Sequence, residues 1–186
     1  NGEAVISSVI RILPLAVFSR PGTKLYVFDS GRSALYYALK TLEVGEGDEV
    51  LVQAYTCVVV VNAIKFTGAK PIFIDINNTF NIDPADLEKR ITPKTKVLII
   101  QHTFGLPANL DLLLAIAAKH NIKIIEDCAH SLGVKYNGQL VGTFGHIGMF
   151  SFGSDKIISC ARGGALITND NKIGDKIKKL SLLCIM

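Results

Sequence analysis

The residue with the clearest chemical potential is a lysine between apolar segments. Lys156 lies in "FSFGSDKIISCARGG" (150–164), shortly before the pair Gly163-Gly164. A lysine near a sheet edge with neighbouring positive charge can act as a nucleophile toward carbonyl groups, and a glycine pair permits close backbone approach beside it. An ordinary surface lysine is the alternative, and this segment alone does not decide between the two.

An acid and a histidine follow another apolar segment. Asp127 ends "IKIIED" (122–127), and His130 comes three residues later. Ligands of open parallel sheets bind outside the carboxyl ends of the strands, where a carboxylate can hold a protonated ring nitrogen. Taken alone, Asp127 also fits a helix cap or a solvated loop acid. His130 fits either a ligand contact or a structural role.

A small-residue turn is the third candidate. In Asp29-Ser30-Gly31-Arg32-Ser33 an apolar segment runs into the start of a helix. Free backbone N–H groups and the positive end of the helix converge at such a turn, which suits a phosphate. Ser151, which precedes Lys156, would add a hydroxyl to the same anion. The competing interpretation is a helix N-cap formed by Ser30.

The elements that must position these residues alternate along the chain. Short apolar segments and helix-period segments take turns, which predicts an α/β domain with a mostly parallel sheet flanked by helices. The predicted strands cover 24–28, 49–53, 70–76, 96–102, 122–127, 146–152 and 164–169. The predicted helices cover 58–67, 83–91 and 108–121. Apolar residues at helical spacing predict two more helices, over 35–42 and 173–180.

Composition and charge exclude several classes of protein. Apolar residues make up 49% of the chain and charged residues 19%, an excess that suggests surface for a partner chain or a further domain. The net charge is +4 with scattered Lys and Arg, which argues against a nucleic-acid partner. The four cysteines lack metal-site spacing, so we expect no metal and free thiols of a cytoplasmic protein.

The N-terminal segment is apolar but interrupted. "AVISSVIRILPLAVF" contains Arg11 and Pro14, is too short to span a bilayer and lacks the layout of a secretory signal. We therefore expect no membrane partner, and interpret residues 1–23 as an N-terminal arm that packs on another surface.

A phosphate cradle, a carboxylate for a ring nitrogen and a lysine for a Schiff base are together what pyridoxal phosphate demands. The motifs that carry them come in a defined order over about residues 24–170: "SGRSAL", "GAKPIFIDI", "HTFG", "EDCAHSLG" and "FSFGSDK", then "RGG" and "ITND". In this order they resemble the DegT/StrS family of pyridoxal-phosphate-dependent sugar aminotransferases. The resemblance implies the large domain of a fold-type I transferase.

The resemblance also implies roles for individual positions. Lys156 would carry the cofactor and shuttle the proton, and Asp127 would pair with the pyridine nitrogen. His130 would lie near the phenolic oxygen. The phosphate would be held by Gly31, Arg32 and Ser151, with Ser33 capping the helix or assisting. At Cys57 the family commonly has an aromatic residue that stacks on the ring; Tyr55 is the nearest aromatic here, so the residue that covers the ring stays open.

For the whole protein, the resemblance implies amino transfer from glutamate or glutamine to a nucleotide-linked keto-sugar in a homodimer. Residues 24–186 would be the cofactor-binding large domain, without the C-terminal small domain and inactive by itself. A sugar dehydratase or other lyase on the same scaffold is one alternative, and Lys156 argues against it because such relatives usually lack the lysine. A non-catalytic regulatory protein is the other.

Overall fold

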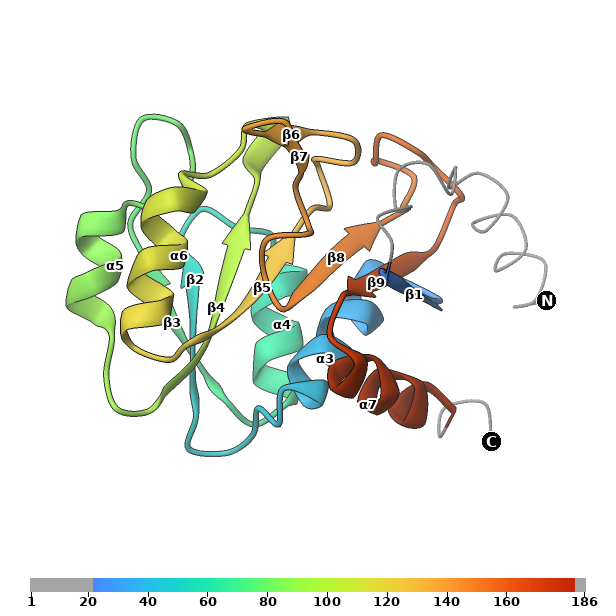
Figure 1. Ribbon diagram of the computed structural model, residues 1–186, viewed down its shortest axis with the longest axis horizontal. Helices are drawn as coiled ribbons and strands as arrows, with labels where there is room; N and C mark the ends of the chain where they lie inside the picture. Colours follow the sequence, from blue (N-terminus) through green and yellow to red (C-terminus); the bar gives the residue numbers. More distant parts are fainter. Residues whose placement is uncertain (1–21, 183–186) are drawn as a thin grey trace.

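The computed structural model describes residues 22–182. Residues 1–21, and with them nearly all of the predicted N-terminal arm, lie outside this range. The described part of the chain forms a seven-stranded sheet between two layers of helices, with a short two-stranded hairpin at one end (Figure 1).

The sheet is parallel except at one strand. Its strands are β1 (Lys24–Phe28), β2 (Glu49–Gln53), β3 (Lys70–Ile74), β4 (Thr95–Gln101), β5 (Lys123–Asp127), β8 (Ile147–Ser151) and β9 (Gly164–Thr168), in the order β1-β9-β8-β5-β4-β2-β3. Strand β9 is antiparallel to both of its neighbours, and every other pair is parallel. The predicted α/β class is confirmed, whereas the reversal of β9 was not predicted.

Each face of the sheet has its own helices and its own core. Helices α3 (Gly31–Thr41), α4 (Val58–Phe66) and α7 (Asn171–Leu182) pack on one face, and α5 (Pro84–Arg90) and α6 (Leu110–Lys119) pack on the other (Figure 1). Successive residues of a strand point to opposite faces. Val50 and Val52 therefore join the core under α3 and α4, while Leu51 joins the core under α5 and α6.

One small element was missed although the sequence signals it. Strands β6 (Lys135–Tyr136) and β7 (Gln139–Leu140) pair as a hairpin around Asn137 and Gly138. Both turn residues have positive φ, 47° and 82°. An Asn-Gly pair is the strongest short-range hairpin signal because both positions of a type I′ turn need positive φ.

The topology gathers the ends of distant segments at one edge. Because β9 alone is reversed, β1, β2, β4, β5 and β8 all end at the same edge of the sheet, and β9 begins there. The turn into α3, Asp127 and Ser151 therefore meet, as ligand sites of open α/β sheets do.

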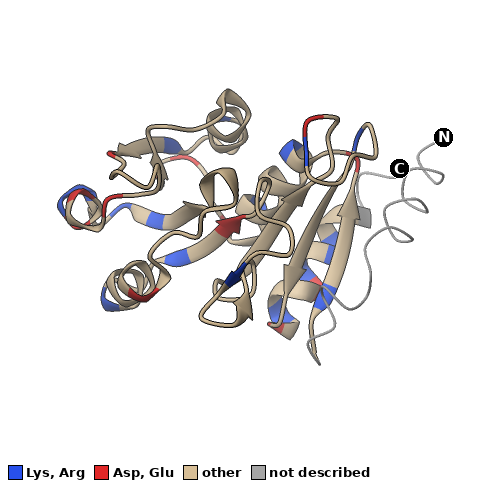
Figure 2. Cartoon of the chain, turned by 90° about the horizontal axis from the view of Figure 1, so that it is seen from above, with Lys and Arg blue, Asp and Glu red and all other residues tan. Residues whose placement is uncertain are grey.

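The described surface carries both signs of charge. Figure 2 shows Lys and Arg as well as Asp and Glu scattered over helices, loops and strands of the described residues. Within residues 22–182, no helix combines the length and the apolar content that crossing a membrane requires.

Candidate active site

A cavity of about 320 Å³ lies at this edge of the sheet. Its walls come from the first turn of α3, the segment 55–60, the ends of β4, β5 and β8, and the loop between β8 and β9. Of the predicted site residues, the lining includes Gly31, Arg32, Cys57, Asp127, His130, Ser151 and Lys156. Ser33 is the exception, so the structure brings together all but one of them.

The turn into α3 forms one wall of the cavity. Ser30 is the N-cap, and its Oγ accepts a hydrogen bond from Ser33 N at 3.2 Å while the two hydroxyls lie 2.9 Å apart. Ser33 thus belongs to the cap and not to the cavity lining. The amides of Gly31 and Arg32 open the helix, where N–H groups have no intrahelical acceptor. The N-cap that the sequence offered as one alternative is therefore formed, and Gly31 and Arg32 of the same turn line the cavity.

Glycine is needed at two positions around this turn, because the Ser151 side chain comes very near to Gly31 and backbone comes very near to Gly164. A Cβ on Gly31 would lie 2.7 Å from both Cβ and Oγ of Ser151. A Cβ on Gly164 would lie 2.4 Å from the carbonyl oxygen of Ser30. The lack of a side chain at Gly164 therefore lets β9 approach the turn into α3 closely. The lack of one at Gly31 lets Ser151 Oγ lie beside the first amides of that helix.

Asp127 forms the floor of the cavity at the end of β5. The residue is buried, and its Oδ1 accepts a hydrogen bond from Ala129 N at 3.0 Å. Burial raises the pKa of Asp127 above its usual value, and the hydrogen bond from Ala129 and the nearby His130, His102 and Lys156 offset only part of that effect. A cationic group in the cavity would supply the missing stabilisation of the carboxylate.

Lys156 approaches the same cavity from the loop after β8. Its side chain is 16% exposed, and its Nζ lies 3.0 Å from Asp155 Oδ2 and 3.1 Å from His130 Nε2. The ammonium contact also helps to hold the pKa of the Asp155 carboxyl below its usual value. The lysine is thus held by two polar partners beside the cavity and is not the free surface lysine that the sequence left open.

Aromatic residues at the cavity mouth were largely missed by sequence reasoning. Phe104, inside the quoted "HTFG" motif, lines the cavity and stacks on His130 with ring centroids 5.7 Å apart and planes at 11°. Tyr55 also lines the cavity and contacts Phe104 and Phe80. The only signal in the sequence was Phe104 followed by Gly105 shortly after a predicted strand. That pattern alone is compatible with any turn.

The start of α4 supplies a further part of the lining. Cys57 is the N-cap of α4, is exposed and makes no side-chain capping bond. Thr56 Oγ1 is buried without a hydrogen-bond partner among the described residues, and so is Gln101 Oε1 at the end of β4. Both Thr56 and Gln101 line the cavity. Buried polar atoms without a partner are rare in native proteins, so these two mark a place for a polar ligand or water.

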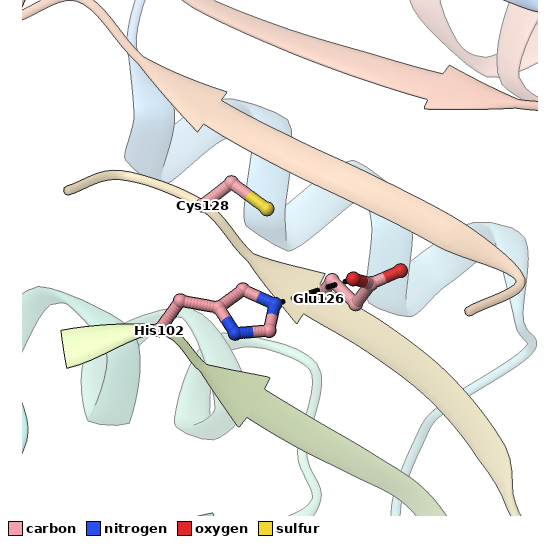
Figure 3. Close-up of side chains that lie close together, drawn as sticks. All are labelled: His102, Glu126 and Cys128. Atoms are coloured by element: carbon pink, nitrogen blue, oxygen red, sulfur yellow. Dashed lines mark hydrogen bonds and ion pairs between the residues drawn. The ribbon is translucent and has the colours of Figure 1, made fainter. Parts of the chain in front are cut away.

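His102, which also lines the cavity, forms a buried polar cluster with Glu126 and Cys128; the side-chain nitrogen, oxygen and sulfur atoms of the three lie within 4.8 Å of one another (Figure 3). His102 Nδ1 accepts from Ala108 N at 3.1 Å, so its Nε2 carries the proton and donates to Glu126 Oε2 at 3.2 Å. Burial raises the pKa of the Cys128 thiol well above its usual value.

The cluster is a hydrogen-bonded scaffold and not a set of open metal ligands. Glu126 also accepts from the amides of Gly142 at 2.6 Å, Phe144 at 2.7 Å and Gly145 at 2.6 Å. Together with the bond from His102, this occupies both carboxylate oxygens twice. Both carboxylate oxygens are thus engaged by the protein, and Glu126 holds the loop that leads into β8.

Comparison with known proteins places the chain in a family. A sequence profile of the DegT/DnrJ/EryC1/StrS aminotransferase family matches residues 23–186. The chain belongs to this family, which confirms the resemblance found in the sequence motifs.

Named relatives and a solved structure share the matched region. The chain is 44% identical over 148 residues to GDP-perosamine synthase of Escherichia coli O157:H7, a match that covers 79% of this chain and 41% of the relative. It is 42% identical over 153 residues to a UDP-N-acetyl-3-dehydro-alpha-D-glucosamine 3-aminotransferase of Acidithiobacillus ferrooxidans, covering 81% and 42%. An aminotransferase structure from Psychrobacter cryohalolentis superposes with a TM-score of 0.84 at 36% identity, covering 88% of this chain and 42% of that one. The chain thus spans about two fifths of the length of these relatives.

Proposed function

We propose that this chain is the cofactor-binding domain of a pyridoxal-phosphate-dependent aminotransferase. Its reaction would move an amino group from glutamate or glutamine onto a keto-sugar linked to a nucleotide. The observation that carries the proposal is the convergence of Lys156, the buried Asp127 and the turn at Gly31 on one cavity. The names of the two curated relatives, one GDP-linked and one UDP-linked, support the substrate class.

The residues of the cavity fit pyridoxal phosphate. Its dianionic phosphate suits the first amides of α3 and the Ser151 hydroxyl that Gly31 holds against them. Its protonated ring nitrogen suits Asp127, a buried carboxyl for which residues 22–182 supply no cationic partner at contact distance. Its aldehyde suits an amine held at the cavity wall, which is Lys156. When bound, the cofactor supplies an electron sink next to the substrate carbon that loses a proton.

The protein groups divide the work between binding and proton transfer. Gly31, Arg32 and Ser151 bind and orient the phosphate, and Asp127 keeps a proton on the ring nitrogen. Lys156 Nζ takes up and releases the proton on the cavity side, as a general base and acid must from within hydrogen-bond reach. His130 Nε2, 3.1 Å away, orients that amine.

A second copy of the protein is part of the proposal. Two apolar residues of the cavity lining, Tyr55 and Phe104, are exposed, and so are Val58 and Ile157, which adjoin lining residues along the chain. An apolar patch of this kind marks an interaction surface, and a homodimer would cover it. Cys57, Cys128 and Cys160 are free thiols, which supports a cytoplasmic location.

The proposal is tested on the full-length protein that contains this chain. Purified with pyridoxal phosphate, it should absorb visible light, and borohydride should fix the cofactor covalently to Lys156. Peptide mapping locates the label, and Lys135 provides a control because it is an exposed lysine on the β6–β7 hairpin. Lys156→Ala should abolish transamination of a UDP- or GDP-keto-sugar, whereas Lys135→Ala should leave it unchanged. Label on another lysine, or an active Lys156→Ala enzyme, would overturn the assignment.

A further inference from the structure

Phe104 combines two features that neither packing nor backbone preference explains. Its side chain is 61% exposed, so burial does not account for a large aromatic residue here. Its backbone has φ 53° and ψ 28°, in the left-handed region that a bulky side chain rarely adopts. Strain of this kind persists only where the surroundings impose it, and it gathers at functional sites.

Buried side chains impose this conformation from both sides of the turn. Asn81 Oδ1 accepts from Thr103 N at 3.0 Å, and Asn81 Nδ2 donates to Leu106 O at 3.1 Å. Gln53 Nε2 donates to Thr103 Oγ1 at 3.0 Å, and His102 Nδ1 accepts from Ala108 N at 3.1 Å. All three of these polar side chains are buried. The backbone from which the Phe104 side chain projects is therefore held by buried side chains.

The Phe104 ring lies flat against one residue of the cavity. Phe104 stacks on His130, and the other end of that imidazole meets Lys156 Nζ through Nε2 at 3.1 Å. An ammonium group has three donors and no acceptor, so Nε2 must accept and the proton of the neutral imidazole lies on Nδ1. The contact between Lys156 and His130 thus requires both a particular ring plane and a particular tautomer.

We propose that Phe104 is a positioning residue, whose stacked ring holds the His130 imidazole with Nε2 toward Lys156 and its proton on Nδ1. The inference rests on the proposed function, in which Lys156 is the reacting amine. Without the stacked ring, the imidazole is free to turn about its side-chain bonds. The Nε2 contact and the tautomer preference are then lost together.

The test uses the cofactor-free full-length protein with ¹⁵N-labelled histidine. Nitrogen chemical shifts distinguish the two imidazole tautomers, and His130→Gln identifies the resonances of His130. In the parent protein they should show Nδ1 protonated and Nε2 accepting. Phe104→Gly, which relaxes the backbone while removing the ring, should lose this signature without lowering the melting temperature. The kcat of the loaded enzyme should fall by about 10- to 100-fold, as misplaced catalytic groups do. Phe104→Tyr should restore both readouts.

The chain offers a matched control in Phe80. It also has positive φ, 60°, and is 49% exposed, and it contacts the Phe104 ring but makes no ring contact with His130. Phe80→Gly should keep the His130 signature and most of the kcat. If Phe104→Gly folds poorly, Phe104→Asn serves instead, because asparagine tolerates this backbone region.

The inference is overturned if the ring-less Phe104 variant keeps the Nδ1–H signature, or if Phe80→Gly loses it equally. It fails separately from the proposed function, because the tautomer is read without cofactor. An active Lys156→Ala enzyme would remove the function while leaving the spectroscopic result intact.

Discussion

Gly31→Ala tests whether the turn into α3 and Ser151 form one anion site. The new Cβ would lie 2.7 Å from Ser151 Cβ and Oγ and 3.3 Å from its Cα, well inside normal contact. Inserting one methyl group into packed structure costs about 1–3 kcal/mol. Alanine returns at most about 1 kcal/mol of helix propensity, and less at a helix end. The free energy of unfolding should therefore fall by about 1–2 kcal/mol, which lowers the melting temperature by about 2–8 °C.

A second substitution should relieve this clash. Ser151→Gly removes both atoms that lie at 2.7 Å, so Gly31→Ala combined with Ser151→Gly should cost less than the sum of the single changes. Urea unfolding measures this coupling, and fluorescence titration with pyridoxal phosphate measures affinity in the same proteins. The double variant should recover stability but not affinity, because the hydroxyl is gone. Additive unfolding energies, or unchanged affinity in Gly31→Ala, would refute the close approach and the shared site.

Two further predictions concern adjacent acids of β5. Burial raises the pKa of Asp127 in the folded state above its value in the unfolded state. The cofactor-free protein should therefore lose stability as the pH rises from the unfolded-state pKa to the folded-state pKa. The loss should be about 1.4 kcal/mol for each pH unit between these two pKa values. Asp127→Asn should remove this slope and be the more stable protein at pH 7, while binding the cofactor less tightly; parallel stability profiles of the two proteins between pH 4 and 8 would contradict this. Glu126→Gln replaces an acceptor oxygen by an amide donor that faces backbone amides. Urea unfolding should show that the free energy of unfolding falls by about 2–4 kcal/mol. A fall of less than about 1 kcal/mol would show that the hydrogen bonds of Glu126 are dispensable.

The strands and most of the helices followed from the sequence because their signals are local. Lys24–Phe28 and Glu49–Gln53 were predicted with the bounds that the structure gives. The reversal of β9 was not predicted, since it depends on which strands pair across the sheet, and apolar content is the same in either direction. Asn137-Gly138 could have been read as a hairpin, because its turn chemistry is local.

The sequence predicted those site residues that lie near the end of an apolar strand segment. It missed those whose position depends on contacts between distant parts of the chain. Asp127 and Lys156 follow apolar segments and were predicted to meet. Phe104 acquires its position from hydrogen bonds of Asn81 and Gln53, which lie far away along the chain. No pattern within "HTFG" reveals a ring stacked on His130. The role of Glu126 was missed for the same reason, because its partners come from the loop at 142–145.

The pairing register explains why adjacent residues at this edge have such different surroundings. Gln101 pairs with Asp127 across β4 and β5, and Asp127 pairs with Met149 across β5 and β8. Residues two apart share a face, so Gln101, Asp127 and Ser151 all lie on the α3 side, where the cavity is. His102 follows Gln101 and Glu126 precedes Asp127, so their side chains point to the opposite side of the sheet, where they hydrogen-bond to each other. A one-residue slip of β5 would place Glu126 in the cavity and leave Asp127 facing the amides of the 142–145 loop with a shorter side chain. Glu126, which meets three backbone amides and a histidine, thereby locks the register that delivers Asp127 to the cavity.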